Sequence, residues 1–122
     1  MPAMRGRTRI FAIALRTGHV AGMAGVVGGV WLGAPDAAIR PWAVLTALTG
    51  LGLVATEVAH GREWPFQGRG VASILHLAVL AAAALPGAGP GATMAALVIG
   101  MAGSHMPRGW RKWSFRQRRV VD

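Results

Sequence analysis

The residues of this sequence that are most able to do chemistry are its four histidines: His19, His60, His76 and His105. Each lies in a different apolar stretch of the chain. An imidazole titrates near neutral pH and ligates metals through a ring nitrogen. Because an ionisable side chain is costly in the hydrocarbon of a membrane, its presence there marks a functional site by default. The histidines therefore indicate haem, metal or proton chemistry.

Glu57 and His60 form a Glu-x-x-His pair, a spacing that places both side chains on one face of a helix. Carboxylate di-metal bundles use this spacing, but they need two such motifs and two further glutamates. Glu57 is the only acid in the apolar stretches, so we do not expect a di-iron site. The pair predicts a single-metal site, a shared proton, or a carboxylate that orients an imidazole.

Each histidine also has a simpler interpretation. His60 can lie in the lipid headgroup region, and His105 can cap the end of a helix, where a cation suits the helix dipole. His19 and His76 have apolar neighbours on both sides. Their simpler interpretation is a neutral imidazole bonded to a backbone carbonyl or to a nearby hydroxyl.

The composition identifies the elements that must position these side chains. Hydrophobic residues make up 53% of the 122 residues and charged residues 14%, whereas a soluble domain carries about 25% charged residues. The absence of cysteine excludes disulfides, iron–sulfur clusters and thiolate zinc sites. We expect membrane-spanning helices at about residues 10–32, 41–60, 70–85 and 92–106, since a span needs about 20 apolar residues.

The connections between these helices are short, so neighbouring helices must be antiparallel. All thirteen Lys and Arg residues except Arg40 then fall on one side if both termini are cytoplasmic, in agreement with the positive-inside rule. The sequence thus predicts an all-α, integral membrane four-helix bundle of up-down-up-down topology in a bacterial-type inner membrane. Residues 1–122 form a single membrane domain, and residues 107–122 form a basic cytoplasmic tail.

Two other interpretations of the basic residues are less consistent with the pattern. A net charge of +9 is typical of nucleic-acid binding, but the cations flank apolar runs instead of forming one patch, so no nucleic-acid partner is expected. A cleaved signal peptide ending near Ala34 is disfavoured because Arg16 and His19 interrupt its apolar region.

Four glycines of the first helix, spaced four, three and four residues apart, share one face: Gly18, Gly22, Gly25 and Gly29. Such a face lets another backbone approach closely, within the bundle or in a homodimer. The alternative is a groove that admits a flat cofactor ring. On the second helix, Thr46, Thr49 and Thr56 form a polar stripe that predicts an inward-facing surface with interhelical hydrogen bonds.

The segment from His19 to Gly33 is a histidine followed by a glycine-rich stretch that ends Gly-Gly-Val-Trp-Leu-Gly. It resembles the opening helix of small haem-associated membrane proteins of the CopD and HemJ kind, and the resemblance covers the first helix only. It implies a helical bundle that holds b-type haem through helix histidines. His19 is the only residue of this chain to which the resemblance assigns haem binding.

The first functional hypothesis is therefore haem b held by two imidazoles drawn from His19, His76 and His105. Arg16 or Arg108, at the cytoplasmic interface, would pair with the propionates. Electrons would pass to a quinone or to a partner subunit.

Two alternatives remain open at this point. One is a cofactor-free accessory subunit that packs into a membrane complex through its glycine-rich first helix. The other is metal or proton handling at Glu57 and His60. No nucleophile triad or phosphate loop stands out, so a carrier or a subunit is expected more than an enzyme. Basic residues of the tail are expected to attract anionic lipid headgroups, with an ordinary positive-inside tail as the simpler interpretation.

Overall fold

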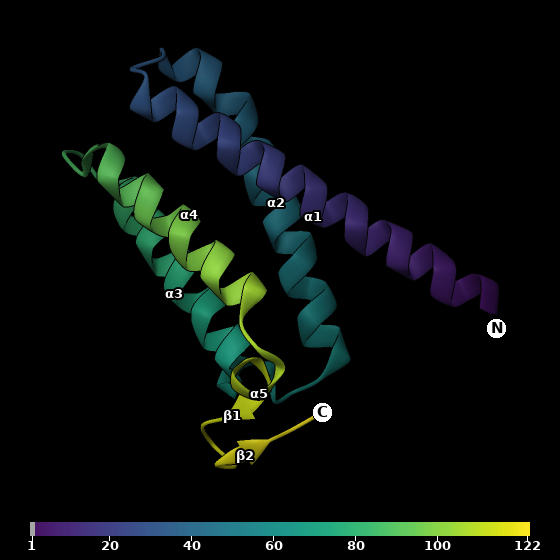
Figure 1. The fold of residues 1–122 in the computed structure, drawn as a ribbon. Helices are drawn as coiled ribbons and strands as arrows, with labels where there is room; N and C mark the ends of the chain where they lie inside the picture. Colours follow the sequence, from purple (N-terminus) through teal and green to yellow (C-terminus); the bar gives the residue numbers. More distant parts are fainter. Residues whose placement is uncertain (1) are drawn as a thin grey trace. The chain divides into compact units, whose positions relative to one another are not determined.

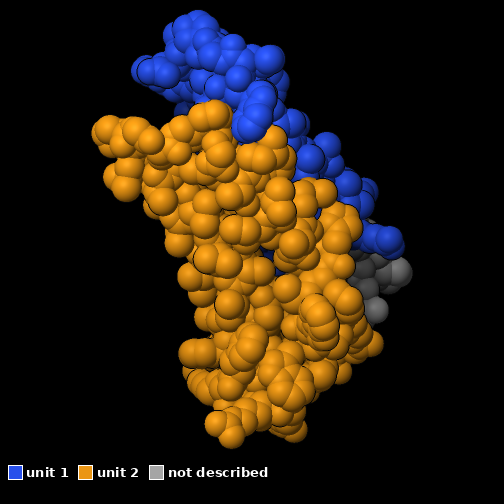
Figure 2. All heavy atoms as spheres, turned by 60° about the vertical axis from the view of Figure 1, so that its left-hand side comes forward, with its two compact units in different colours: residues 1–57 blue, residues 58–122 orange. Residues whose placement is uncertain are grey.

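A computed structural model describes the backbone of residues 2–122 and the side chains from Thr8 onward. Arg5 and Arg7, which the sequence places on the cytoplasmic flank, lie outside the described side chains. The chain is mostly helical and divides into two compact units, residues 1–57 and 58–122 (Figures 1 and 2). The elements are α1 (Pro2–Trp31), α2 (Asp36–His60), a 3₁₀ turn η1 (Trp64–Phe66), α3 (Gly68–Ala83), α4 (Gly89–His105), α5 (Arg108–Arg111), β1 (Trp113–Ser114) and β2 (Arg119–Val120).

Two of these helices are long and apolar enough to cross a membrane: Thr8–Trp31 of α1 and all of α2. Only 17% and 6% of their most apolar windows are buried inside the protein, so both helices leave most of their apolar surface exposed. Large exposed apolar surfaces of this kind mark contact with lipid or with another protein. The α3 and α4 helices have 16 and 17 residues and are shorter.

The first unit is a helical hairpin whose seam is the glycine face of α1. A Cβ added at Gly22 would lie 2.9 Å from the backbone nitrogen of Thr46, and one added at Gly25 would overlap the side chain of Trp42. The two helices therefore approach closely because α1 has no side chains at these positions. Gly33, in the turn, has a φ of 68°, a conformation that glycine adopts without strain.

The α2 helix begins earlier than the sequence predicts. Pro41 favours a helix start, but α2 begins at Asp36 and contains Pro41 in its second turn. Pro35 takes the initiating role instead, because its carbonyl accepts hydrogen bonds from Ala38 and Ile39. The predicted start at residue 41 was wrong, since a proline in an early turn costs only one intrahelical hydrogen bond.

The second unit is built on an antiparallel hairpin of α3 and α4, which lie side by side in Figure 1. Its seam consists of small residues: Ala96 is fully buried, and a Cβ added at Gly103 would lie 2.8 Å from the Cβ of Ala72. The α3 helix spans residues 68–83, against the predicted 70–85.

The turn between α3 and α4 is tighter than predicted. The string from Pro86 to Gly91 suggests a turn without helix, yet α4 already begins at Gly89. Pro90 fits the first helical turn, where its missing N–H has no intrahelical partner to lose. The reversal is confined to residues 84–88, where Gly87 has a φ of 82°.

The basic tail is folded. The fourth helix ends at His105 and does not continue toward Trp110. After α5, the strands β1 and β2 form a short antiparallel ladder, with Trp113 opposite Val120. Ser114 also forms a bridge with Gln67, which follows η1. The tail thus packs back onto the connection between α2 and α3.

Candidate functional site

The imidazole of His19 is fixed by the second helix of its hairpin. Its Nδ1 lies 3.0 Å from the carbonyl oxygen of Thr46 and 3.3 Å from Oγ1 of Thr49. The ring packs against Gly50, where an added Cβ would come within 2.9 Å of the ring carbon Cε1. His19 is therefore positioned by backbone and by the absence of a side chain at residue 50.

The imidazole of His76 is fixed in the same way in the other hairpin. Its Nδ1 lies 2.6 Å from the carbonyl oxygen of Ala96 on α4. A Cβ added at Gly100 would come within 3.0 Å of that Nδ1. His76 is buried, with 9% of its surface exposed.

The two hairpins thus share one arrangement, in which a histidine of the first helix donates to a carbonyl of the second and a glycine follows four residues after that carbonyl. We call the sets His19–Thr46–Gly50 and His76–Ala96–Gly100 the imidazole clamps. In an α-helix the carbonyl of residue i points at residue i+4. A side chain at i+4 would crowd an outside donor, and glycine removes that obstacle.

The clamp also determines which ring nitrogen carries the proton. A carbonyl oxygen can only accept a hydrogen bond, so Nδ1 must be the donor in both clamps. In the neutral ring Nε2 is then the basic nitrogen, able to take up a proton or ligate a metal. Histidines that ligate metals commonly donate their other ring N–H to a carbonyl in this way.

His105 differs from the other two candidate ligands. Its Nδ1 lies 2.9 Å from the carbonyl of Met101, one turn earlier in the same helix, and the side chain is exposed. It makes no contact of the clamp type with a second helix. This geometry agrees with the simpler interpretation of His105 as a group at the end of α4.

The two arginines predicted to pair with propionates occupy different settings. Arg16 is exposed on α1 and lines a shallow hollow of about 450 Å³ together with Thr17, Val20, Ala21 and Ala24. Arg108 is held by Asp122, with a guanidinium-to-carboxylate distance of 2.7 Å. That pairing raises the pKa of Arg108, chiefly through the hydrogen bond. Arg108 is therefore already engaged with a carboxylate of its own chain.

Glu57 and His60 lie in the last turns of α2, Glu57 half-buried and His60 exposed. Within the described part of the chain, no cluster of three or more His, Cys, Asp or Glu side chains could hold a metal ion. A metal at Glu57 and His60 would thus need ligands beyond the groups that the described residues bring together.

The glycine face of α1 and the threonine stripe of α2 face each other. Gly18 lies against the methyl group of Thr49, and Gly22 lies against Thr46, which is 7% exposed. Both hydroxyls donate to carbonyls one turn earlier in α2. Tight packing within the hairpin is confirmed as the role of the glycines, and α2 fills the space that a cofactor ring would need.

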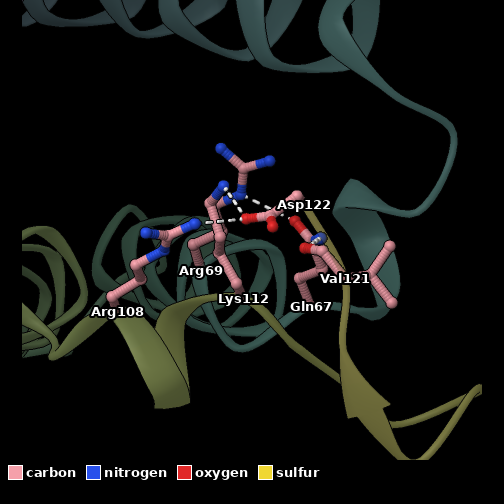
Figure 3. A network of polar contacts seen from close by, with 6 residues as sticks. All are labelled: Gln67, Arg69, Arg108, Lys112, Val121 and Asp122. Atoms are coloured by element: carbon pink, nitrogen blue, oxygen red, sulfur yellow. Dashed lines mark hydrogen bonds and ion pairs between the residues drawn. The ribbon is translucent and has the colours of Figure 1, made fainter.

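A polar cluster in the second unit was not expected from the sequence. Gln67, 2% exposed, donates through Nε2 to the carbonyl of Val121 over 2.9 Å and accepts from Nε of Arg69 (Figure 3). Asp122 accepts from both Arg108 and Lys112 at 2.7 Å. These hydrogen bonds lower the pKa of Asp122 to about 2, and the bond from Lys112 has the largest effect.

A second set of contacts fixes the same tail to η1. Ser114, which is fully buried, donates to Glu63 over 3.2 Å, and Arg116 pairs with the other oxygen of Glu63 at 2.5 Å. Phe66 accepts a hydrogen bond from the backbone of Phe115 through its carbonyl. The signal for this cluster in the sequence is a lone uncharged polar residue beside aromatic residues, as in Phe66-Gln67 and Trp113-Ser114-Phe115.

No known protein family model matches the chain, and no characterised protein or solved structure is similar to it. The resemblance of the segment from His19 to Gly33 to the CopD and HemJ kind thus stays a prediction carried by those residues alone.

Proposed function

We propose that this chain is a small multi-pass protein of a bacterial-type inner membrane that binds b-type haem through its imidazoles. Four helices, α1 to α4, would cross the bilayer with both termini in the cytoplasm. The two long apolar helices support this placement, as does the location of every Lys and Arg residue except Arg40 on the side that this topology makes cytoplasmic. The α3 and α4 helices reach about 24–26 Å at 1.5 Å per residue, a mismatch that local thinning of the bilayer accommodates.

The observation that carries the proposal is the pair of imidazole clamps. His19 and His76 each donate through Nδ1 to a carbonyl of a neighbouring helix, and this orients the ring and makes Nε2 the basic nitrogen. Imidazoles held in this way would be suitable ligands for haem iron. A bound haem would supply one-electron redox chemistry, exchanged with a quinone or a partner subunit.

The residues of the chain would have distinct roles in this account. His19 and His76 would each be available to hold haem iron through Nε2, and the carbonyl that each contacts keeps its ring from rotating. Arg16, exposed on α1 close to His19 in sequence, is the arginine available to a propionate. Arg108 is assigned to Asp122 instead.

Absorption spectra of the protein purified in mild detergent test this function. Oxidised protein should show a Soret band, and dithionite reduction should give split visible bands. His19→Ala and His76→Ala should each abolish the low-spin spectrum, whereas His105→Ala should leave it unchanged. A colourless protein that takes up no added haemin would contradict haem binding, as would a spectrum indifferent to both clamp variants.

A second candidate is a cofactor-free accessory subunit of a membrane complex. The observation in its favour is that each clamped ring packs against a glycine inside its own hairpin, a role that needs no cofactor. Because α2 already covers the glycine face of α1, a partner would bind the exposed apolar face that includes Ile13 and Val20. This candidate predicts a colourless protein that co-purifies with another subunit and loses it on Val20→Trp.

A further inference from the structure

An apolar groove in the second unit has no role in the proposed haem chemistry. Its volume is about 510 Å³. Residues of α3, α5 and β1 line it, together with two residues outside these elements, Met106 and Phe115: Gly68, Val71, Ala72, Leu75, Met106, Gly109, Trp110, Trp113 and Phe115. The volume is typical of small-molecule pockets, which measure about 300–1,000 Å³. Every lining residue is apolar or glycine, so the groove suits a hydrocarbon chain better than a polar head.

The aromatic residues at this groove are well exposed. The exposed fraction is 72% for Trp110, 40% for Trp113 and 60% for Phe115. Tryptophan is enriched where a membrane protein meets the lipid headgroups, because its ring is apolar and its N–H is polar. The groove therefore has the composition of a site at the membrane surface.

Basic residues alternate with the groove residues along the tail. Arg108, Arg111, Lys112 and Arg116 each adjoin a lining residue in the sequence. Asp122 and Glu63 engage three of them. Arg111 forms no ion pair among the residues that the structure describes, and it is half-buried beside Trp110. The charge that remains around the groove is positive.

We propose that the groove holds an acyl chain of an anionic phospholipid whose phosphate is bound by Arg111. This inference deepens the membrane placement in the proposed function and does not depend on haem. An apolar cleft beside the Arg111 guanidinium complements a molecule with a hydrocarbon chain and a negative head. A quinone is a poorer match, because the groove offers its carbonyls no donor side chain other than the indole N–H groups.

Native mass spectrometry of the detergent-extracted protein, delipidated and then incubated with phosphatidylglycerol or phosphatidylcholine, tests the site. One phosphatidylglycerol should remain bound per chain. Gly109→Trp fills the groove, and it is sterically allowed because a Cβ at this glycine meets nothing within 4 Å. This substitution should weaken phosphatidylglycerol binding by about tenfold or more, which is the factor expected when two methylene groups of the acyl chain are no longer buried.

Gly91→Trp is the matched control, because Gly91 is also open to a Cβ and lies in the first turn of α4, outside the groove lining. This variant should bind lipid as the parent does. Arg111→Gln should reduce the preference for phosphatidylglycerol over phosphatidylcholine while the chain still binds. Equal retention of both lipids by the parent protein would overturn the proposal.

Other outcomes are also decisive. A change from dimer to monomer on Gly109→Trp, with lipid binding unaltered, would identify a second copy of the chain as the occupant and overturn the lipid proposal. Recovery of the protein outside the membrane fraction would overturn both this inference and the proposed function. A colourless membrane protein that retains phosphatidylglycerol would overturn haem binding alone.

Discussion

The α1–α2 and α3–α4 hairpins fix an imidazole in the same way although their seams are built from different residues. The α1–α2 seam is a row of glycines on α1 that receives Trp42 and Thr46 from α2. The α3–α4 seam consists of alanine and glycine. Residues at matching positions of the two seams are therefore mostly different.

What the hairpins do share is the clamp. In each, the carbonyl that accepts from histidine precedes the glycine under the ring by four residues. Since the seams around them differ, the two clamps do not follow from a common packing scheme. We interpret the repeated feature as the one tied to chemistry, and the seams as two ways of supporting it.

The largest expected effect concerns the seam of the first hairpin. Gly22→Leu should separate α1 from α2, because even a Cβ at this position would lie 2.9 Å from the backbone nitrogen of Thr46. A backbone atom cannot move aside as the end of a flexible side chain can. Overpacking costs about 1–3 kcal/mol, and contact with backbone places this variant at the upper end. The free energy of unfolding, from circular dichroism in increasing sodium dodecyl sulfate, measures it.

Gly28→Leu is the control on the same helix, since a Cβ at Gly28 meets nothing within 4 Å. It should leave the unfolding free energy unchanged or raise it by up to about 1 kcal/mol through better helix propensity. Equal destabilisation by both substitutions would contradict the assignment of the glycine face to the hairpin seam.

A smaller effect separates the clamps from the seams. Gly50→Ala should displace the ring of His19, and Gly100→Ala that of His76, because each new methyl group would lie about 3 Å from ring atoms. Weakening the imidazole–carbonyl hydrogen bond should cost about 0.5–1.5 kcal/mol. Each substitution should also reduce haem affinity while retaining the histidine itself.

Haemin titration followed by the Soret band compares these two variants with Gly28→Ala. If both clamps hold haem ligands, both clamp variants should weaken haemin binding to a similar degree. A clamp variant that binds haemin as tightly as Gly28→Ala does would show that its clamp is structural only.

The smallest effect lies in the tail, which has no counterpart in the first hairpin. Native Asp122 has a pKa of about 2, below its ordinary value of 3.8, so its pairing stabilises the folded tail fully above about pH 4. That contribution should decline as the pH falls from about 4 to 2 and be absent below that range. Because Asp122 is exposed, the effect should be modest and should weaken with salt.

Limited proteolysis of the tail as a function of pH measures this contribution. In the parent protein, the rate of tail cleavage should change between pH 4 and pH 2, and Asp122→Asn should remove this change. At neutral pH the tail of the variant should be cleaved faster than that of the parent. A parent protein whose tail is cleaved at the same rate across that interval would contradict the assigned role of Asp122.

The helices were predictable from the sequence because apolar runs of helical length need no long-range information. Their ends were not: the start of α2 depends on whether Pro35 or Pro41 begins the first turn, and that of α4 on whether Pro90 belongs to the turn or the helix. Either choice satisfies the local rules.

The candidate site was predictable in its residues and not in its geometry. The sequence singles out His19 and His76 as imidazoles among apolar neighbours and proposes a carbonyl as one partner. Which carbonyl accepts depends on the rotation of one helix against the other, which Gly50 and Gly100 permit. The fold of the tail was missed because its strands have two residues each and carry no periodicity.

If the clamps position haem ligands, both hold the Nδ1–H tautomer and leave Nε2 as the ligand nitrogen. ¹⁵N NMR of protein labelled at histidine tests it directly, because protonated and unprotonated ring nitrogens have well-separated shifts, and single variants assign the four histidines. We expect Nδ1–H signals for His19 and His76, with their Nε2 resonances lost or strongly shifted on adding haemin. Nε2–H tautomers at both residues, or Nε2 signals indifferent to haemin, would contradict it.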